Sequence, residues 1–383
     1  MSLINNSFHI EFIKKSLIST MSSYLYTRVL PYLSVNPPLQ TNFPANALDS
    51  PIAMICDEMT WQSIRHEHPL VFLTPRKWKE AIESLMGKPR LLFCEAAWSG
   101  TKHSGPCWRG QVYRDRRVRY ENRHALMQIL DYCNANKIPT VFWAKEDPVF
   151  FQDKIYDFTD TALRFDHILT TAEECINSYR AQGHPSVHLW PFGFSPALFY
   201  PPEDITQPRE QAAVFAGSWY KDQPERCADM SELFDMVLSR GIPLRIYDRN
   251  QVSGNSSKPF PKRYRPFVKD AVDYEELGEI YRNALYAVNI NTMRNSNSMF
   301  ARRVYETMAC GAIVISNDSS GMRAQFGDRV WYTGERFDHS REGQIRRDNI
   351  YEVFTKHTWT ARLRQLWEIV EHLHITYGGQ DID

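Results

Sequence analysis

Two arginines and a glutamate form the most chemically suggestive cluster in the sequence. Arg302 and Arg303 begin a stretch, residues 300–310, in which apolar residues recur at helical spacing, and Glu306 follows one turn after Arg302. Guanidinium groups at a helix start suit a phosphate, and a carboxylate one turn further suits ribose hydroxyls. The same pattern also fits an ordinary crossover helix with a surface ion pair between Arg302 and Glu306.

A second candidate phosphate contact is the pair Gly217–Ser218, which follows a short apolar run. Glycine lets the backbone approach a diphosphate closely, while the serine hydroxyl and the ammonium of Lys221, three residues further, can bind its oxygens. Arg249 follows the next strand-like run, and we expect it to reach the phosphate or the base.

Neutral polar residues follow a third strand-like run, which ends at Asn291 and leads into a loop that includes Ser298. Such side chains can hold sugar hydroxyls or phosphate without a metal ion. The only Asp-x-Asp sequence is the terminal Asp381–Asp383. We therefore predict no metal site, and expect the cationic side chains and a helix N-terminus to stabilise a diphosphate leaving group.

Three carboxylates in the first half of the chain each follow a strand-like apolar run: Asp57, Glu95 and Glu146. The carboxyl ends of parallel strands meet at one edge of a sheet, where ligands bind. A carboxylate there can accept the proton of an attacking hydroxyl. Glu95 is the first choice for this role, Asp57 the second and Glu146 the third. Capping of the next helix by Asp57, and a turn before Pro148 for Glu146, are the structural alternatives.

The residues after Glu95 form a loop rich in glycine, serine and tryptophan. Its composition fits a mobile segment that contacts sugars, and exposed tryptophans stack on sugar rings. Trp98, Trp108 and His103 are therefore candidate acceptor contacts. Core packing of the tryptophans and simple solvation of the histidine are the alternatives.

Strand-like and helix-like segments alternate twice along the chain, which predicts two α/β domains. We place the first over residues 51–200 and the second over residues 201–357, with a proline-dense linker near their junction. Residues 358–383 contain a last strong helix. Residues 1–50 contain an amphipathic helical arm and a linker, which pack on the body, mediate dimerisation or touch a membrane surface.

Composition excludes several classes of protein. The chain has 383 residues, with 45 basic and 45 acidic side chains, so no global positive field favours nucleic acid. Seven scattered cysteines without a Cys-x-x-Cys pair argue against a disulfide framework or structural zinc. No apolar run is long enough to span a bilayer. These features favour a cytoplasmic protein, with peripheral contact at the inner face of the membrane left open.

Residues 50–330 resemble the CgeB-like branch of the group 1 glycosyltransferases, a family of spore-maturation and surface-polysaccharide proteins. The stretches that carry the resemblance are IAMICDEM, FCEAAWSG, TVFWAKEDPVFF, FDHILTTAEECINSY, FAGSWYKDQPER, IYDRN and VNINTMRNSNSMFARRVYE. Glu306 matches the second of two glutamates spaced eight apart in many members, and Ser298 stands at the position of the first. Val268 matches a position where relatives hold the nucleobase by backbone contacts.

The resemblance implies a GT-B fold, in which two Rossmann-like domains face each other across a cleft and the C-terminal helix crosses back to the first domain. It also implies transfer of a sugar from a nucleotide diphosphate to a glycan or glycolipid acceptor, without a further cofactor. A GT-B-like nucleotide-sugar epimerase and a non-catalytic nucleotide-sugar-binding protein are the alternatives. A dinucleotide oxidoreductase is disfavoured because no Gly-x-Gly-x-x-Gly occurs.

Overall fold

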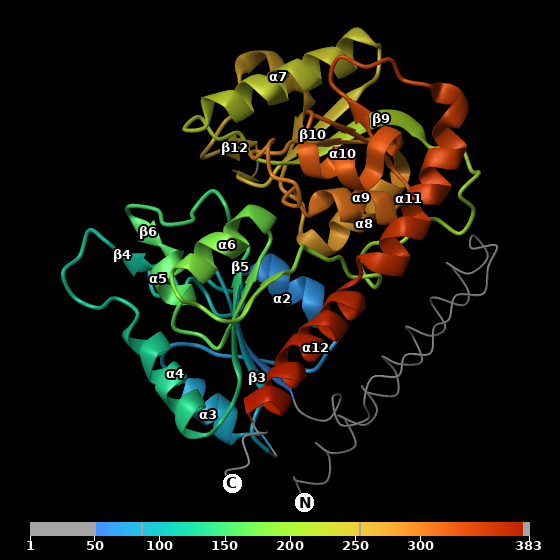
Figure 1. Cartoon of the computed structure of the whole chain (residues 1–383). Coiled ribbons are helices and arrows are strands. Elements are labelled where there is room, and N and C mark those ends of the chain that lie inside the picture. The colour runs from blue at the N-terminus through green and yellow to red at the C-terminus, as the bar shows by residue number, and fades with distance from the viewer. Residues whose placement is uncertain (1–50, 86, 253, 378–383) are drawn as a thin grey trace, which may run out of the picture.

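The structure, a computed structural model, describes residues 51–377 except residues 86 and 253. The predicted arm and linker over residues 1–50, and the terminal Asp381–Asp383, therefore lie outside the described residues. The described residues form two α/β domains, each built around its own six-stranded sheet (Figure 1).

The first sheet has six parallel strands in the order β2-β1-β3-β5-β7-β8. Its order reverses between β1 and β3, and ligands bind at such a switch point in open α/β sheets. The strands are β1 Ile52–Ile55, β2 Leu70–Phe72, β3 Leu91–Glu95, β5 Thr140–Ala144, β7 His167–Thr170 and β8 Val187–Leu189. The helices are α2 Glu58–Ile64, α3 Trp78–Glu83, α4 His124–Ala135, α5 Phe158–Ala162 and α6 Glu173–Ala181, and a small ribbon pairs β4 Arg114–Asp115 with β6 Tyr156–Asp157.

The second sheet repeats this plan, with six parallel strands in the order β13-β10-β9-β14-β15-β16 and a switch point between β9 and β14. Its strands are β9 Glu210–Gly217, β10 Leu244–Asp248, β13 Val268–Lys269, β14 Ala284–Asn289, β15 Ile313–Ser316 and β16 Trp331–Tyr332, with a small β11–β12 ribbon at Gln251–Val252 and Asn255–Ser256. Its helices are α7 Pro224–Ser239, α8 Leu277–Asn283, α9 Arg303–Ala309, α10 Ser320–Phe326 and α11 Glu342–Lys356, with 3₁₀ turns at Lys262–Phe267 (η4), Tyr274–Glu276 (η5), Gly327–Arg329 and His339–Arg341.

The four central strands of the first sheet, β1, β3, β5 and β7, are buried on both faces, so their side chains alternate between two cores. Ala53 and Ile55 of β1 pack with α3, α4 and α6, whereas Ile52 and Met54 pack on the opposite face. That opposite face is covered by helix α12, Trp359–Tyr377, the last element of the chain. Figure 1 shows α12 in red beside the blue first strands, which confirms the predicted return of the C-terminal helix to the first domain.

Tryptophans explain why α12 docks there. The ring centroids of Trp143 on β5 and Trp190 after β8 lie 5.6 Å and 5.5 Å from that of Trp359, and the indole of Trp190 donates to the carbonyl of Arg362 at 2.9 Å. Two chain segments that connect the domains also pair directly, since the amide of Trp359 donates to the carbonyl of Phe194. The exact domain limits proposed from the sequence stay a prediction.

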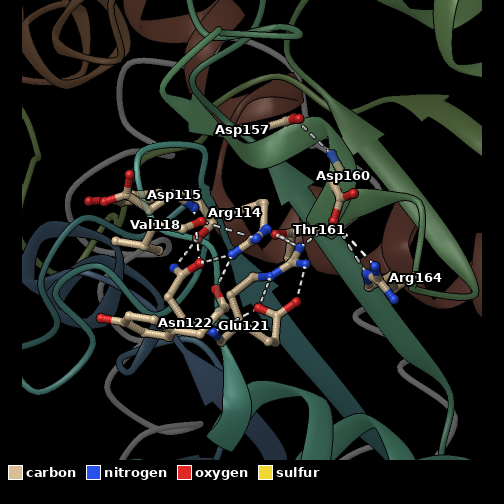
Figure 2. Close-up of polar contacts among 12 residues, drawn as sticks. Arg114, Asp115, Val118, Glu121, Asn122, Asp157, Asp160, Thr161 and Arg164 are labelled. Carbon is tan, nitrogen blue, oxygen red and sulfur yellow. Dashed lines mark hydrogen bonds and ion pairs between the residues drawn. The ribbon is translucent and has the colours of Figure 1, made fainter.

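The long connection from β3 to α4 is ordered by its own polar contacts (Figure 2). The side-chain oxygen of Asn122 accepts hydrogen bonds from the amide of Asp115 and the guanidinium of Arg114, and its NH₂ group donates to the carbonyls of Gly110 and Tyr113. Among the described residues, no helix is both long enough and apolar enough to cross a bilayer.

Candidate active site

Asp57, Glu95 and Lys145 meet at the switch point of the first sheet. The ammonium of Lys145 lies 2.8 Å from Oε1 of Glu95 and 3.2 Å from Oδ2 of Asp57. Glu95 also accepts hydrogen bonds from the backbone N–H of Asp57 and the hydroxyl of Thr60, each at 2.5 Å. The predicted convergence of strand-end carboxylates at one sheet edge is therefore observed for these residues.

The surroundings of the two carboxylates shift their pKa values in opposite directions. Burial raises the pKa of Glu95 above its ordinary value, although Lys145 opposes the shift. Burial acts the same way on Asp57, but Lys145 and the backbone N–H groups of residues 98–100 outweigh it and lower the pKa. Those N–H groups lie 2.8–2.9 Å from the Asp57 carboxylate.

These contacts correct the ranking of the candidate bases. Glu95 has no exposed surface and both of its oxygens are engaged, so it cannot contact a substrate without displacing its partners. The Asp57 carboxylate binds the start of the loop after β3. The lowered pKa of Asp57 makes it a weak base. Both side chains build the edge of the site, and their contacts disfavour them as bases.

Glu146 lies one residue beyond Lys145 and is only half-buried. Burial raises the pKa of Glu146, while Lys145 and a hydrogen bond with the Trp98 side chain oppose the shift. A partly exposed carboxylate with a raised pKa, at the carboxyl end of a parallel strand, has the properties of a general base.

The predicted acceptor residues differ in placement. Trp108 is fully buried and its indole donates to the carbonyl of Leu73 at 2.7 Å, so it is a core residue and cannot stack on a sugar. Trp98 is half-buried and packs edge-on against Phe150 and Phe158. His103 is exposed.

In the second domain, Arg303 lies against Gly217 at the switch point of the sheet. A Cβ atom added to Gly217 would lie 3.1 Å from the Arg303 guanidinium and 2.8 Å from the Phe215 ring, so glycine makes this approach possible. The hydroxyl of Ser218 accepts hydrogen bonds from Arg249 at 3.2 Å and from Asn250 at 2.7 Å. The structure thus brings together Gly217, Ser218, Arg249 and Arg303.

Arg226, near the start of α7, joins this cluster. Its guanidinium donates to the carbonyl of Ser218 at 3.2 Å and lies over the ring of Tyr220. Burial, together with the charge of Arg303, lowers the pKa of Arg226 to about 10. Among the described residues, no carboxylate forms an ion pair with Arg226, Arg249 or Arg303. Arg226 is buried, Arg303 is half-buried and Arg249 is exposed. Guanidinium groups gathered in this way have the charge and the donors to bind an anion.

Two predicted donor residues, Lys221 and Val268, make no described contact with the arginine cluster. Lys221 is exposed, and Val268 lies on β13, an edge strand that pairs with Ile246 of β10. Asn291 is buried and holds its own domain together, since its amide group contacts Ser316 at 3.3 Å and its oxygen accepts from the amide of Ala301 at 3.1 Å.

Ser298 contacts the other domain. Its hydroxyl accepts from the amide of Glu173 at 2.8 Å and donates to the carbonyl of Thr171 at 3.0 Å. Nearby, Ser296 donates to Glu174 at 3.1 Å. The loop before α9 therefore bridges the two domains.

Arg302 and Glu306 form the ion pair that their spacing allowed, with Nε of Arg302 2.9 Å from Oε1 of Glu306. The pair is not on the surface, because the Glu306 side chain is 2% exposed and the Arg302 side chain 11%. The same Oε1 accepts a 2.5 Å hydrogen bond from the hydroxyl of Tyr274. Burial lowers the pKa of Arg302, but Tyr274 and Glu306, with a smaller contribution from Glu95, outweigh it and raise the pKa.

Sequence reasoning missed Lys145, Arg226 and Tyr274. Lys145 stands beside a candidate that was recognised, and Arg226 stands at a helix start after the Gly217–Ser218 turn. No sequence signal marks Tyr274, whose role depends on the packing of two domains.

Neither of two surface cavities overlaps these clusters. One, of about 270 Å³, lies between β10 and α8, and the other, of about 430 Å³, lies beside β6 and α5. No group of three or more His, Cys, Asp or Glu side chains in the described part of the chain is arranged to hold a metal ion.

Residues 239–368 match the family described as glycosyl transferase-like. No curated protein matches the chain. Among solved structures, an alpha-glucosyltransferase in complex with UDP and a 13-mer DNA matches with a TM-score of 0.55 and 12% identity, over 84% of this chain and 99% of that one. HepE of Anabaena in complex with UDP-glucose matches with a TM-score of 0.49 and 13% identity, over 81% of this chain and 86% of that one. Together with the two facing Rossmann-like sheets, the first likeness shows that this chain has the GT-B fold.

Proposed function

We propose that this protein is a glycosyltransferase that moves a sugar from a nucleotide diphosphate to a hydroxyl acceptor. One observation carries the proposal. The guanidinium groups of Arg226, Arg249 and Arg303 gather at the switch point of the second sheet without a carboxylate partner among the described residues. A diphosphate supplies the missing negative charge, and the cations stabilise it as a leaving group.

The match of residues 239–368 to a glycosyl transferase-like family supports this proposal, because the matched segment includes β10, α9 and Glu306. The UDP in the structural neighbour's complex supports a nucleotide as ligand. In the first domain, we assign Glu146 as the base that takes the proton of the acceptor hydroxyl.

We further propose that the enzyme belongs to the CgeB-like branch, works without a metal ion and glycosylates a glycan or glycolipid of a surface polysaccharide at the inner face of the membrane. The sequence resemblance supports these finer points. The complex of the structural neighbour contains DNA, so the prediction of no nucleic-acid partner, drawn from a net charge of zero, needs its own test.

Isothermal titration calorimetry with UDP, GDP, CDP and dTDP tests the donor site. We expect one of the four to bind, and Arg303→Ala to lose that binding. Product analysis with the matching nucleotide sugars then separates the activities. Nucleotide released only when an acceptor is present indicates transfer, whereas a changed sugar on an intact nucleotide indicates an epimerase. Binding of none of the four nucleotides would refute the proposal.

A further inference from the structure

Three consecutive residues at η5 of the second domain contact the first domain. Asp273 pairs with Lys102, and Glu275 pairs with Arg65, the residue that follows α2. Between them, the hydroxyl of Tyr274 lies 3.1 Å from the hydroxyl of Ser63 on α2. The two outer ion pairs are exposed and contribute little. The middle contact is buried, because Ser63 has no exposed surface and Tyr274 is 8% exposed.

The buried contact continues on both sides as a hydrogen-bond chain with one direction. Tyr274 donates its single proton to Oε1 of Glu306 at 2.5 Å. Its oxygen must therefore accept from Ser63, whose own oxygen accepts from the indole of Trp359 at 2.6 Å. Burial and the charge of Glu306 raise the pKa of Tyr274, so the phenol keeps its proton.

This hydrogen-bond chain connects distant parts of the fold. Trp359 begins α12, Ser63 lies on α2 of the first domain, and Glu306 lies on the donor-side helix α9. The orientation of Glu306 therefore depends on contact between the domains. Arg302 competes for the same oxygen of Glu306 from within its own helix, so loss of the tyrosine proton donor leaves Arg302 to set that orientation.

We infer that Tyr274 is a positioning residue that couples closure of the two domains to nucleoside recognition by Glu306. Docking of Ser63 fixes the Tyr274 hydroxyl, which fixes one oxygen of Glu306 and leaves the other to accept from ribose hydroxyls. This inference rests on the proposed function, in which the site beside Glu306 holds a nucleoside diphosphate.

The test compares Tyr274→Phe, Ser63→Ala and the double variant with Tyr264→Phe as a matched control. Tyr264 is also buried in the same domain, and among the described residues its hydroxyl donates to Ser231 and Asp235 on α7. Affinities are measured for pyrophosphate and for whichever of UDP, GDP, CDP and dTDP the wild type binds most tightly.

We expect Tyr274→Phe to weaken the nucleoside diphosphate about tenfold, the scale of one hydrogen bond to a charged group, and to leave pyrophosphate unchanged. Ser63→Ala should reproduce part of this loss although it lies on the other domain, and the double variant should be no weaker than Tyr274→Phe alone. Unchanged nucleoside diphosphate affinity in Tyr274→Phe, or equal losses for both ligands, would overturn the inference.

Failure of the proposed function gives a different result, because the wild type itself would then bind no nucleoside diphosphate. The wild type, the two single variants and the double variant still test the hydrogen-bond chain through their free energies of unfolding. A double-mutant cycle should show coupling between Ser63 and Tyr274. Strictly additive effects on stability would mean that the contact does not exist in solution, and would overturn the inference independently.

Discussion

The ammonium nitrogen of Lys145 lies 2.8 Å from Oε1 of Glu95, at the carboxyl edge of the first sheet. Both groups are held away from solvent, since the Glu95 side chain is fully buried and that of Lys145 is 13% exposed. A buried ion pair of this kind stabilises a local arrangement only while both partners are present. The edge that faces the second domain is therefore built on a pair of opposite charges.

Replacement of Glu95 should destabilise the fold. Glu95→Gln keeps the shape but removes the negative charge beside Lys145, and we expect a loss of about 3 kcal/mol in the free energy of unfolding. Urea denaturation measures this loss, with Glu83→Gln, an exposed residue of α3, as the control. An unfolding free energy equal to that of the wild type would show that Lys145 finds sufficient compensation from Asp57.

Replacement of Glu146 should affect catalysis instead. A general base contributes about 10²–10⁴-fold to rate, so Glu146→Gln should reduce turnover by that factor. Nucleotide affinity should not change, because the arginine cluster lies on the other domain. Steady-state kinetics and calorimetry on the same preparation measure both properties. Full turnover in the variant would remove Glu146 from the mechanism.

The sequence predicted the architecture well, because two series of β-branched runs alternating with helical periods leave few topologies other than two parallel sheets. It also predicted which residues follow the strands, and hence that Asp57 and Glu95 meet. It could not rank them, because burial of Glu95 and the exposure of Glu146 depend on how the loop after β3 packs. Trp108 is a second example, because the sequence does not distinguish a tryptophan exposed in a loop from one buried in the core.

The donor site was predicted in part for a similar reason. Arg303 and the Gly217–Ser218 turn are close in space although they are far apart in the chain, and parallel strand order predicts that proximity. Arg226 and Tyr274 were missed because their contacts depend on tertiary structure. Arg226 donates to the carbonyl of Ser218, eight residues earlier, and Tyr274 contacts Ser63 of the other domain.

Loss of the arginines should weaken binding of the phosphates. Charge-assisted contacts are worth roughly 1.5–3 kcal/mol, so Arg303→Ala and Arg226→Ala should each weaken a nucleoside diphosphate at least tenfold. Pyrophosphate should weaken equally, because both arginines act on the phosphates. Lys221→Ala should have a smaller effect, since Lys221 is exposed. Calorimetry measures all three, with the exposed Arg336→Ala as control, and unchanged affinity in both arginine variants would place the diphosphate elsewhere.

Removal of the Asp57 carboxylate should release the loop after β3. Asp57 accepts from the amides of Trp98, Ser99 and Gly100, so Asp57→Ala leaves three backbone N–H groups without an acceptor. We expect faster hydrogen exchange at these amides and unchanged exchange in the second sheet. Mass spectrometry of peptides that cover the loop measures the effect. Protection equal to that of the wild type would mean that other contacts hold the loop.

The stability of the domain junction should depend on pH through Glu67. This buried carboxyl accepts hydrogen bonds from Ser195, at 3.0 Å, and from Thr360, on the two segments that connect the domains. Burial raises the pKa of Glu67 from 4.5 to about 7, against the effect of both hydrogen bonds.

The direction of the effect follows from the raised pKa. Between these two values the folded state holds a proton that the unfolded state releases, so the stabilisation is present below 4.5 and is lost as pH rises through about 7. Glu67→Gln does not titrate. Relative to the wild type it should therefore gain up to about 3 kcal/mol of stability between about pH 5 and about pH 8. Urea denaturation of both proteins across this range tests the prediction, and parallel stability curves would show that Glu67 ionises in the folded protein without cost.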